Sequence, residues 1–245
     1  MVLQVLLHLC KRNVVATLLV YSRFLTGTVP STIGLLKKLK WIEFLDNSFS
    51  GTVPSEIGQL TKATLLTAYG NAFEGSLPTE MGLLTGLELI RIGDNHFTGL
   101  VPTELGLLTN LELKLNMVLN QFSGMIPTEL GLLTRLSELE LYGNHFSGSI
   151  PSELGLLTQL GKLTFANNSL SGSVPWELSA LQPSLYALSL EGNSLLSGNL
   201  PEALCSINGT CVGTSLLLCD VAGLSYDCDY LLCGCECSCR DGQSK

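Results

Sequence analysis

An asparagine recurs at a fixed interval along most of this 245-residue chain, and that interval constrains the fold more than any other feature. It stands at Asn47, Asn71, Asn95, Asn120, Asn144, Asn168 and Asn193, so that neighbours are 24 or 25 residues apart. Prolines recur with nearly the same spacing from Pro30 to Pro201. A period of this length predicts a solenoid, a stack of similar coils in which each coil contacts mainly its neighbours.

Composition agrees with a folded, elongated chain. Hydrophobic residues make up 46% of the sequence and charged residues 14%, which is unlike a disordered segment. We expect a solenoid of about eight coils over residues 15–203. Residues 1–14 would be an incomplete N-terminal cap or a remnant coil, and 204–245 a cysteine-rich C-terminal cap and tail.

Within one coil, Leu139 and Leu141 alternate with Glu138, Glu140 and Tyr142. This alternation predicts a short strand whose leucines point into the core and whose polar side chains point out. Stacking the coils would align these strands as one parallel sheet. The Ser or Thr after each proline is expected to cap a short helical turn on the opposite side, where the following Glu suits its positive end.

The recurring asparagines form a predicted structural Asn ladder, because each side-chain amide can satisfy backbone groups inside the bend after the strand. Two residues later an apolar side chain is expected to stack from coil to coil: Phe49, Phe73, Phe97, Phe122, Phe146, Leu170 and Leu196. Glycines follow shortly after, from Gly27 to Gly198, where the backbone bends. We interpret all three rows as structure rather than as ligand sites.

The block Leu-x-Gly-x-Ile/Val-Pro-Ser/Thr-Glu-Leu-Gly-Leu-Leu-Thr, which recurs from Leu25 to Pro201, resembles plant-type leucine-rich repeats. Such repeats build the ectodomains of receptor-like kinases and polygalacturonase-inhibiting proteins. The resemblance implies an α/β solenoid, a right-handed leucine-rich repeat superhelix with a parallel β-sheet on the concave face and short helical turns on the convex face. It also implies a second small strand near each Ser/Thr-Gly and a binding function.

The amino end departs from that pattern. Members of this subfamily usually open with a paired-cysteine cap, whereas only Cys10 is available here, and Arg23 stands where the first coil should carry Asn. We therefore expect an incomplete or divergent start. Residues 1–9 are apolar but do not make a convincing signal peptide.

Eight of the nine cysteines lie in the tail, at Cys205, Cys211, Cys219, Cys228, Cys233, Cys235, Cys237 and Cys239. The tail resembles the endings of diatom leucine-rich repeat proteins. A disulfide-stapled cap is the favoured interpretation, with a soft metal such as zinc or copper(I), or a redox thiol, as alternatives. Clustered cysteines, with the glycosylation candidates Asn167 and Asn208, indicate an extracellular or cell-surface protein of the secretory pathway.

Outward strand positions are the best candidates for a partner-binding site on the concave face: Tyr21, Trp41, Glu43, Tyr69, Arg91, Asn116, Glu140, Tyr142, Tyr186 and Glu191. Aromatic residues with a polar end favour interfaces. Seven acidic and four basic residues at these and neighbouring strand positions predict a mildly acidic face that prefers basic or neutral protein partners. Ordinary surface polarity is the alternative for any one of them.

The sequence predicts no catalytic residues, no cofactor and no metal site in the repeats. His96 and His145 occupy equivalent turns two coils apart, about 10 Å, which is too far to share a metal. A net charge of −8 and the absence of a basic stripe argue against nucleic acid. No apolar run reaches the 18 residues needed to span a bilayer.

We therefore expect a non-catalytic recognition module, receptor-like and extracellular or membrane-associated, which binds a protein or peptide. Two alternatives stay open. One is a structural or surface-binding protein that uses regularly spaced Thr and Ser to bind carbohydrate, cell wall or ice. The other is metal binding by the cysteine tail.

Overall fold

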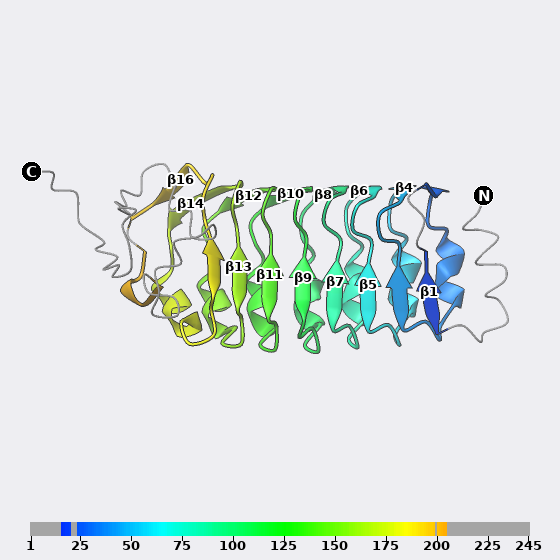
Figure 1. Ribbon diagram of the computed structural model, residues 1–245, viewed down its shortest axis with the longest axis horizontal. Helices are drawn as coiled ribbons and strands as arrows, with labels where there is room; N and C mark the ends of the chain where they lie inside the picture. Colours follow the sequence, from blue (N-terminus) through cyan, green and yellow to red (C-terminus); the bar gives the residue numbers. More distant parts are fainter. Residues whose placement is uncertain (1–15, 21–23, 199, 205–245) are drawn as a thin grey trace, which may run out of the picture.

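The computed structural model describes residues 16–20, 24–198 and 200–204 as a row of eight stacked coils. Each coil contributes a short strand, a turn, a second short strand and a 3-10 helical turn (Figure 1). The expected leucine-rich repeat solenoid is thus confirmed. The expected caps at 1–14 and beyond 204, Tyr21, Asn208 and all the cysteines lie outside the described residues.

The first sheet contains eight parallel strands in the order β1-β3-β5-β7-β9-β11-β13-β15, one from each coil. Their bounds are β1 Thr17–Leu19, β3 Trp41–Glu43, β5 Leu65–Thr67, β7 Leu89–Arg91, β9 Lys114–Asn116, β11 Glu138–Glu140, β13 Lys162–Thr164 and β15 Ala187–Ser189. Equivalent residues pair across the sheet, for example Thr67 with Arg91 and Arg91 with Asn116. Outward side chains of the same repeat position therefore stand side by side on what we call the strand face, the expected concave face.

A second parallel sheet of eight strands follows the turn after the asparagine. Its strands are β2 Thr26–Gly27, β4 Ser48–Gly51, β6 Ala72–Gly75, β8 His96–Gly99, β10 Gln121–Gly124, β12 His145–Gly148, β14 Ser169–Ser173 and β16 Leu195–Ser197. The glycine in each of these strands, or directly after β16, has a positive φ, 75° at Gly124 for instance, which residues with a side chain disfavour. This confirms the second small strand and the bend expected at the glycines.

The opposite side of each coil is a 3-10 helical turn: η1 Ser31–Leu35, η2 Ser55–Gln59, η3 Thr79–Leu83, η4 Thr103–Leu107, η5 Thr128–Leu132, η6 Ser152–Leu156, η7 Trp176–Leu181 and η8 Glu202–Leu204. The expected Ser/Thr caps were wrong. At η5, Pro127 is the residue before the helix, and the Thr128 hydroxyl lies 3.3 Å from Oε2 of Glu129 instead of bonding to a backbone N–H. Pro127, with its fixed φ and extended backbone, takes the position directly before the helix. Thr128 is therefore the first residue of the helix rather than its cap, and its side chain is exposed.

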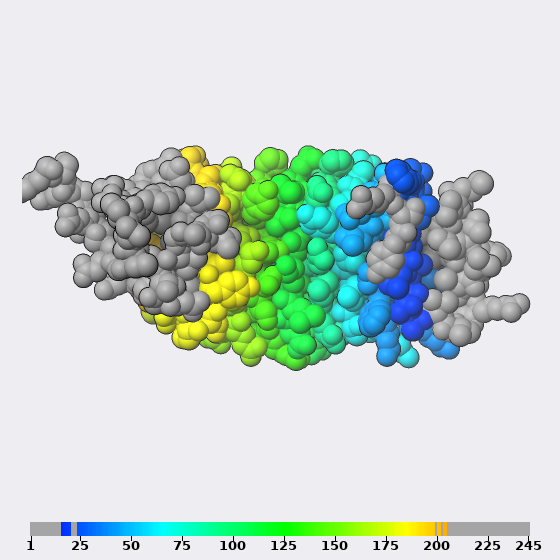
Figure 2. All heavy atoms as spheres, in the orientation of Figure 1, coloured from blue at the N-terminus to red at the C-terminus, as the bar shows by residue number. Residues whose placement is uncertain are grey.

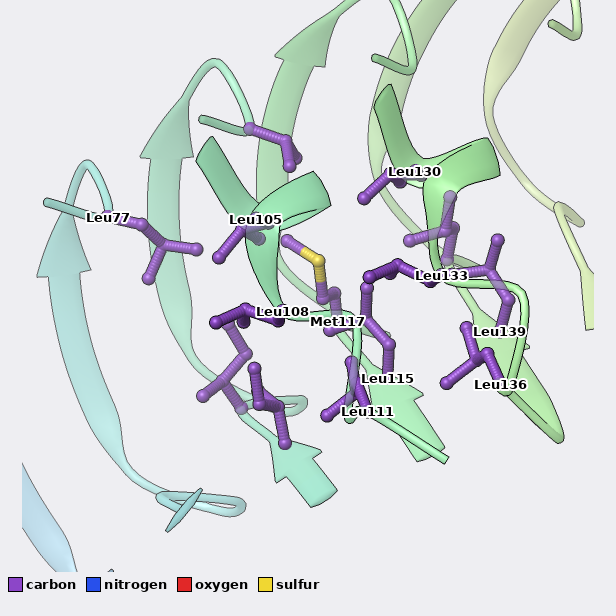
Figure 3. Close-up of a cluster of buried hydrophobic side chains, with 14 of the residues drawn as sticks. Leu77, Leu105, Leu108, Leu111, Leu115, Met117, Leu130, Leu133, Leu136 and Leu139 are labelled. Atoms are coloured by element: carbon purple, nitrogen blue, oxygen red, sulfur yellow. The ribbon is translucent and has the colours of Figure 1, made fainter. Parts of the chain in front are cut away.

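The core lies between the strands of the first sheet and the helical turns. Figure 3 shows leucines of η4 and η5 facing leucines of the strands, with Met117 between them. Leu105, Leu115 and Leu139 are each at most 1% exposed. A row of phenylalanine rings stacks from coil to coil at the end of the coil that carries the second sheet. Neighbouring ring centroids in this row lie 5.9 to 6.4 Å apart, and its members are Phe49, Phe73, Phe97, Phe122 and Phe146. The predicted apolar row is therefore confirmed as part of the core.

The Asn ladder is confirmed as a set of backbone bonds that join consecutive coils. Nδ2 of Asn120 donates to the carbonyl of Ile92 in the preceding coil at 3.1 Å and to Val118 in its own coil at 3.1 Å. Its Oδ1 accepts the amide N–H of Phe97 at 3.0 Å. Asn71 is half-buried and its six equivalents are buried, so the row is closed to ligands.

Candidate functional site

The strand face presents side chains from all eight coils as one surface, seen in Figure 2 from the blue first coil to the yellow last coils. Trp41, the first residue of β3, and Tyr186, which directly precedes β15, are exposed there at 47% and 46%. Glu43, Tyr69, Arg91, Tyr142 and Glu191 are half-buried. The predicted site residues within the described ranges thus share one face.

Two of the predicted contact residues do not project into solvent. Asn116 and Glu140 are each 6% exposed. Both side chains are engaged with neighbouring coils: Asn116 Nδ2 donates a short hydrogen bond to Oε2 of Glu140, and Lys114 and Lys162 contact the Glu140 carboxylate. The expectation that these two residues are freely accessible for a partner was therefore wrong.

Three charged residues, Lys114, Glu138 and Lys162, surround this buried pair, and together with Glu140 they make two positive and two negative charges. Lys114 Nζ lies 2.6 Å from Oε2 of Glu138 and 3.4 Å from Oε2 of Glu140, and Lys162 Nζ lies 2.5 Å from Oε1 of Glu140. Burial alone would raise the pKa of Glu140. The hydrogen bonds from Lys162 and Asn116 and the charge of Lys114 outweigh burial, so its pKa is lowered.

Tyr186 lies beside these charged residues, on the side of the last coils. Its hydroxyl donates to Oε1 of Glu138 at 3.2 Å, across two coils. Burial and the negative charge of Glu138 raise the pKa of this phenol, so Tyr186 stays a neutral hydrogen-bond donor. Lys114, Glu138, Glu140, Lys162 and Tyr186 therefore form one network of ion pairs and hydrogen bonds, with an exposed aromatic ring at its edge.

Arg91 differs from these charged residues, because its guanidinium contacts an aromatic ring and forms no ion pair with any residue that the structure describes. Its Cζ lies 5.3 Å from the centroid of the Tyr69 ring, a cation–π distance. Gly93 makes room for this ring, since a Cβ there would lie 3.1 Å from Cε2 of Tyr69. Burial, followed by the charge of Asp94, raises the pKa of Tyr69, which is therefore neutral and able to donate.

Three buried polar atoms on adjacent strands of this region have no hydrogen-bond partner among the described residues. They are Oγ1 of Thr67, Nε of Arg91 and Oδ1 of Asn116. The three residues pair with one another in strand register, so the atoms stand in a row across β5, β7 and β9. A buried polar atom without a partner is costly, so this row is a place where the packing of the strand face is not fully satisfied.

The sequence reasoning did not single out Thr67, which lies beside Arg91 in the first sheet. Thr67 is the last residue of β5, as Arg91 and Asn116 are the last residues of β7 and β9, but its small hydroxyl gave no reason to choose it.

Other predicted sites lie apart from this row. His96 and His145 are exposed at the first residues of β8 and β12, and the part of the chain that the structure describes contains no group of three metal-ligating residues. Asn167 is exposed in the turn after β13, with φ of 52°, so its side chain is accessible as a glycosylation acceptor would have to be. Within the described ranges, no helix has the length and apolarity to cross a bilayer.

Comparison with known proteins gives one family and several similar structures. A family model described as Leucine Rich Repeat matches residues 135–157, and no curated protein sequence matches. A solved TDR receptor is 36% identical, with a TM-score of 0.77 over 81% of this chain and 34% of the receptor chain.

Two further structures differ in what their names say they bind. The ectodomain of the Arabidopsis receptor kinase HAESA, in complex with an extended IDA peptide hormone ligand, is 31% identical, with a TM-score of 0.65 over 79% of this chain and 36% of that one. A plant ice-binding protein is 27% identical, with a TM-score of 0.62 over 71% of this chain and 55% of that one. The chain spans about a third of the length of the TDR receptor and HAESA chains.

Proposed function

Because the chain belongs to the plant-type leucine-rich repeat family, we propose that it is a non-catalytic recognition module that binds a protein or peptide on its strand face. The observation that carries this proposal is the Arg91 guanidinium on the strand face, which lies over the Tyr69 ring, 5.3 Å from its centroid, and has no ion pair among the described residues. The HAESA structure, which holds a peptide hormone, supports a peptide-sized partner. An extracellular or cell-surface setting is part of the proposal, as for the similar receptor ectodomains.

The contact is centred on Tyr69 and Arg91. An Arg guanidinium that rests on an aromatic ring is held in place and keeps its donors for a planar acceptor such as a carboxylate. Thr67 and Asn116 flank it on the adjacent strands, but both side chains are buried, so the exposed contacts come from Arg91 and the aromatic residues around it. Trp41 on one side and Tyr142 and Tyr186 on the other add the aromatic area that interfaces favour.

This assignment refines the charge expectation. The carboxylates of Glu138 and Glu140 are occupied by Lys114 and Lys162, so they are not available to attract a basic partner. Arg91 and Lys40 are the cations of this face that have no ion pair among the described residues, and Arg91 is the one held against an aromatic ring. The proposed partner therefore carries an acidic group for Arg91.

The experiment is selection of peptides from a random display library against the purified chain, followed by affinity measurements on variants. We expect Arg91→Met and Tyr69→Ala to weaken the selected peptides at least tenfold. Lys62→Met, which removes a cation from an exposed loop on the helical side, should leave affinity unchanged. Equal affinity for all four proteins would exclude the strand face as the binding site.

A second candidate is binding to an extended surface such as ice, favoured by the similarity to a plant ice-binding protein. Thr28, Thr52 and Ser76 repeat once per coil on the flank and are exposed there, which gives a regular row of hydroxyls. Thermal hysteresis of the purified protein that disappears in Thr28→Lys and Thr52→Lys, but survives Arg91→Met, would favour this function. Absence of hysteresis would exclude ice.

Metal binding by the cysteine tail stays a separate proposal, which rests on cysteine spacing alone. Stoichiometric zinc or copper that survives dialysis of protein made under non-oxidising conditions would support it. Eight oxidised tail sulfurs without metal would favour the disulfide cap instead.

A further inference from the structure

Three exposed apolar side chains interrupt rows of Ser and Thr on one flank of the solenoid. The position after the bend glycine holds Leu100 and Met125, but in the other described coils it holds Thr28, Thr52, Ser76, Ser149 and Ser173. The position after proline holds Trp176, but Ser or Thr in the six preceding coils. Leu100, Met125 and Trp176 are 66%, 71% and 74% exposed, so the core does not require them.

All three line one open groove of about 1290 Å³ that runs along the stacking direction between the second sheet and the helical turns. Its floor contains the Val or Ile before each proline, such as Ile126 and Ile150, which are each 2% exposed. Exposed apolar groups above an apolar floor remain in contact with water unless another molecule covers them.

The same groove has an acidic rim. Glu129, Glu153 and Glu177 line it, whereas no Lys, Arg or His does. None of the three carboxylates forms an ion pair among the described residues. The repeat places a Glu here in six of the eight coils, but only in this part of the row does it stand beside exposed Leu, Met and Trp side chains.

We propose that this groove binds an extended segment of a partner protein in which apolar residues are interspersed with Lys or Arg. The apolar side chains would cover Leu100, Met125 and Trp176, and the cations would pair with the three glutamates. The groove runs from the coil of Leu100 to that of Leu200, four steps of about 4.8 Å, which corresponds to about six residues of extended chain.

This surface is separate from the strand face. Its lining residues come from the second sheet and the helical turns, whereas Tyr69 and Arg91 belong to the strand face. The two proposals can therefore fail independently, and a partner bound here leaves the strand face free for another.

The test uses a fluorescein-labelled octapeptide of alternating Leu and Lys, a matched peptide of Leu and Glu, and fluorescence anisotropy with the full chain. One variant, Leu100→Ser/Met125→Ser/Trp176→Ser, gives each residue the identity that the same position has in other coils. A second is Glu129→Gln/Glu153→Gln/Glu177→Gln. The matched control is Glu56→Gln/Glu80→Gln/Glu104→Gln, which changes the same repeat position outside the groove and lowers the negative charge by the same amount.

We expect both groove variants to bind the Leu/Lys peptide at least tenfold more weakly than wild type and the control to bind within twofold. The Leu/Glu peptide should bind at least tenfold more weakly to wild type. Equal losses in the groove and control charge variants would mean unspecific attraction to an acidic protein and would overturn the proposal. Self-association abolished by the apolar variant, without peptide binding to wild type, would assign the groove to a second copy of the chain and would overturn it as well.

Discussion

Lys162 Nζ lies 2.5 Å from Oε1 of Glu140, a residue of the preceding coil, and the Glu140 side chain is only 7% exposed. Lys114 approaches the other carboxylate oxygen from the coil before, at 3.4 Å. One buried carboxylate thus joins three consecutive coils through charge. In a solenoid, where stability depends on contacts between neighbouring coils, such a link should be measurable.

Replacing Lys162 by Met keeps the aliphatic length of the side chain and removes its charge. Glu140 then loses a charge-assisted hydrogen bond, and we expect the free energy of unfolding to fall by about 2 kcal/mol. Urea denaturation followed by circular dichroism measures this change. Lys62→Met, at an exposed loop, is the control and should cost less than about 0.5 kcal/mol. Equal costs would mean that the ion pair contributes nothing specific.

The lowered pKa of Glu140 predicts a pH dependence with a defined sign. In the folded state Glu140 releases its proton at lower pH than in the unfolded chain, so its contribution to stability is complete above its ordinary pKa. That contribution is lost as pH falls through the lower folded-state pKa. The stability difference between wild type and Glu140→Gln should therefore shrink when urea denaturation is repeated from about pH 6 down to about pH 3. A difference that stays constant or grows would contradict the assignment.

Glu140 also shows where sequence reasoning ends. The alternation of Leu139 and Leu141 with polar residues correctly predicts that Glu140 points away from the core. Whether an outward side chain is covered depends on Lys114 and Lys162, which lie a full coil away on either side and whose conformations the pattern does not contain. The same limit applies to Thr67, whose unpartnered hydroxyl is apparent only once the strands are in register.

The Asn ladder, in contrast, was predictable because one local requirement repeats in every coil. Asn120 meets it with bonds to Ile92, Val118 and Phe97 that no apolar side chain can replace. We expect Asn120→Ala to lower the free energy of unfolding by about 3 kcal/mol, because buried backbone groups of two coils lose their partners.

Asn110→Ala is the matched control for Asn120→Ala. Asn110 also donates to a backbone carbonyl, that of Thr85 at 2.8 Å, but it is exposed, so water can take its place. We expect a cost below about 1 kcal/mol in the same denaturation experiment. If both substitutions cost the same, burial of the ladder does not contribute to stability.

Gly106 tests a role of glycine that the sequence pattern did not reveal. It lies inside η4, where its φ is not positive, so its backbone conformation does not require glycine. A Cβ at this position would lie 2.5 Å from the carbonyl oxygen of Glu129 in the next coil. Close approach of successive helical turns, rather than a special φ, therefore excludes a side chain, and the same holds at Gly131 and Gly155.

Gly106→Ala should consequently destabilise the protein by about 2 kcal/mol, in the range of overpacked cores, although Ala is the better helix former. Ser179 occupies the equivalent position in η7, so a Cβ is already accommodated there, and Ser179→Ala is expected to change stability by less than about 0.5 kcal/mol. Thermal unfolding of both variants, with wild type alongside, gives the comparison. A neutral or stabilising Gly106→Ala would show that helix propensity outweighs the contact. The spacing between coils would then have to be set by the strands and the Asn ladder alone.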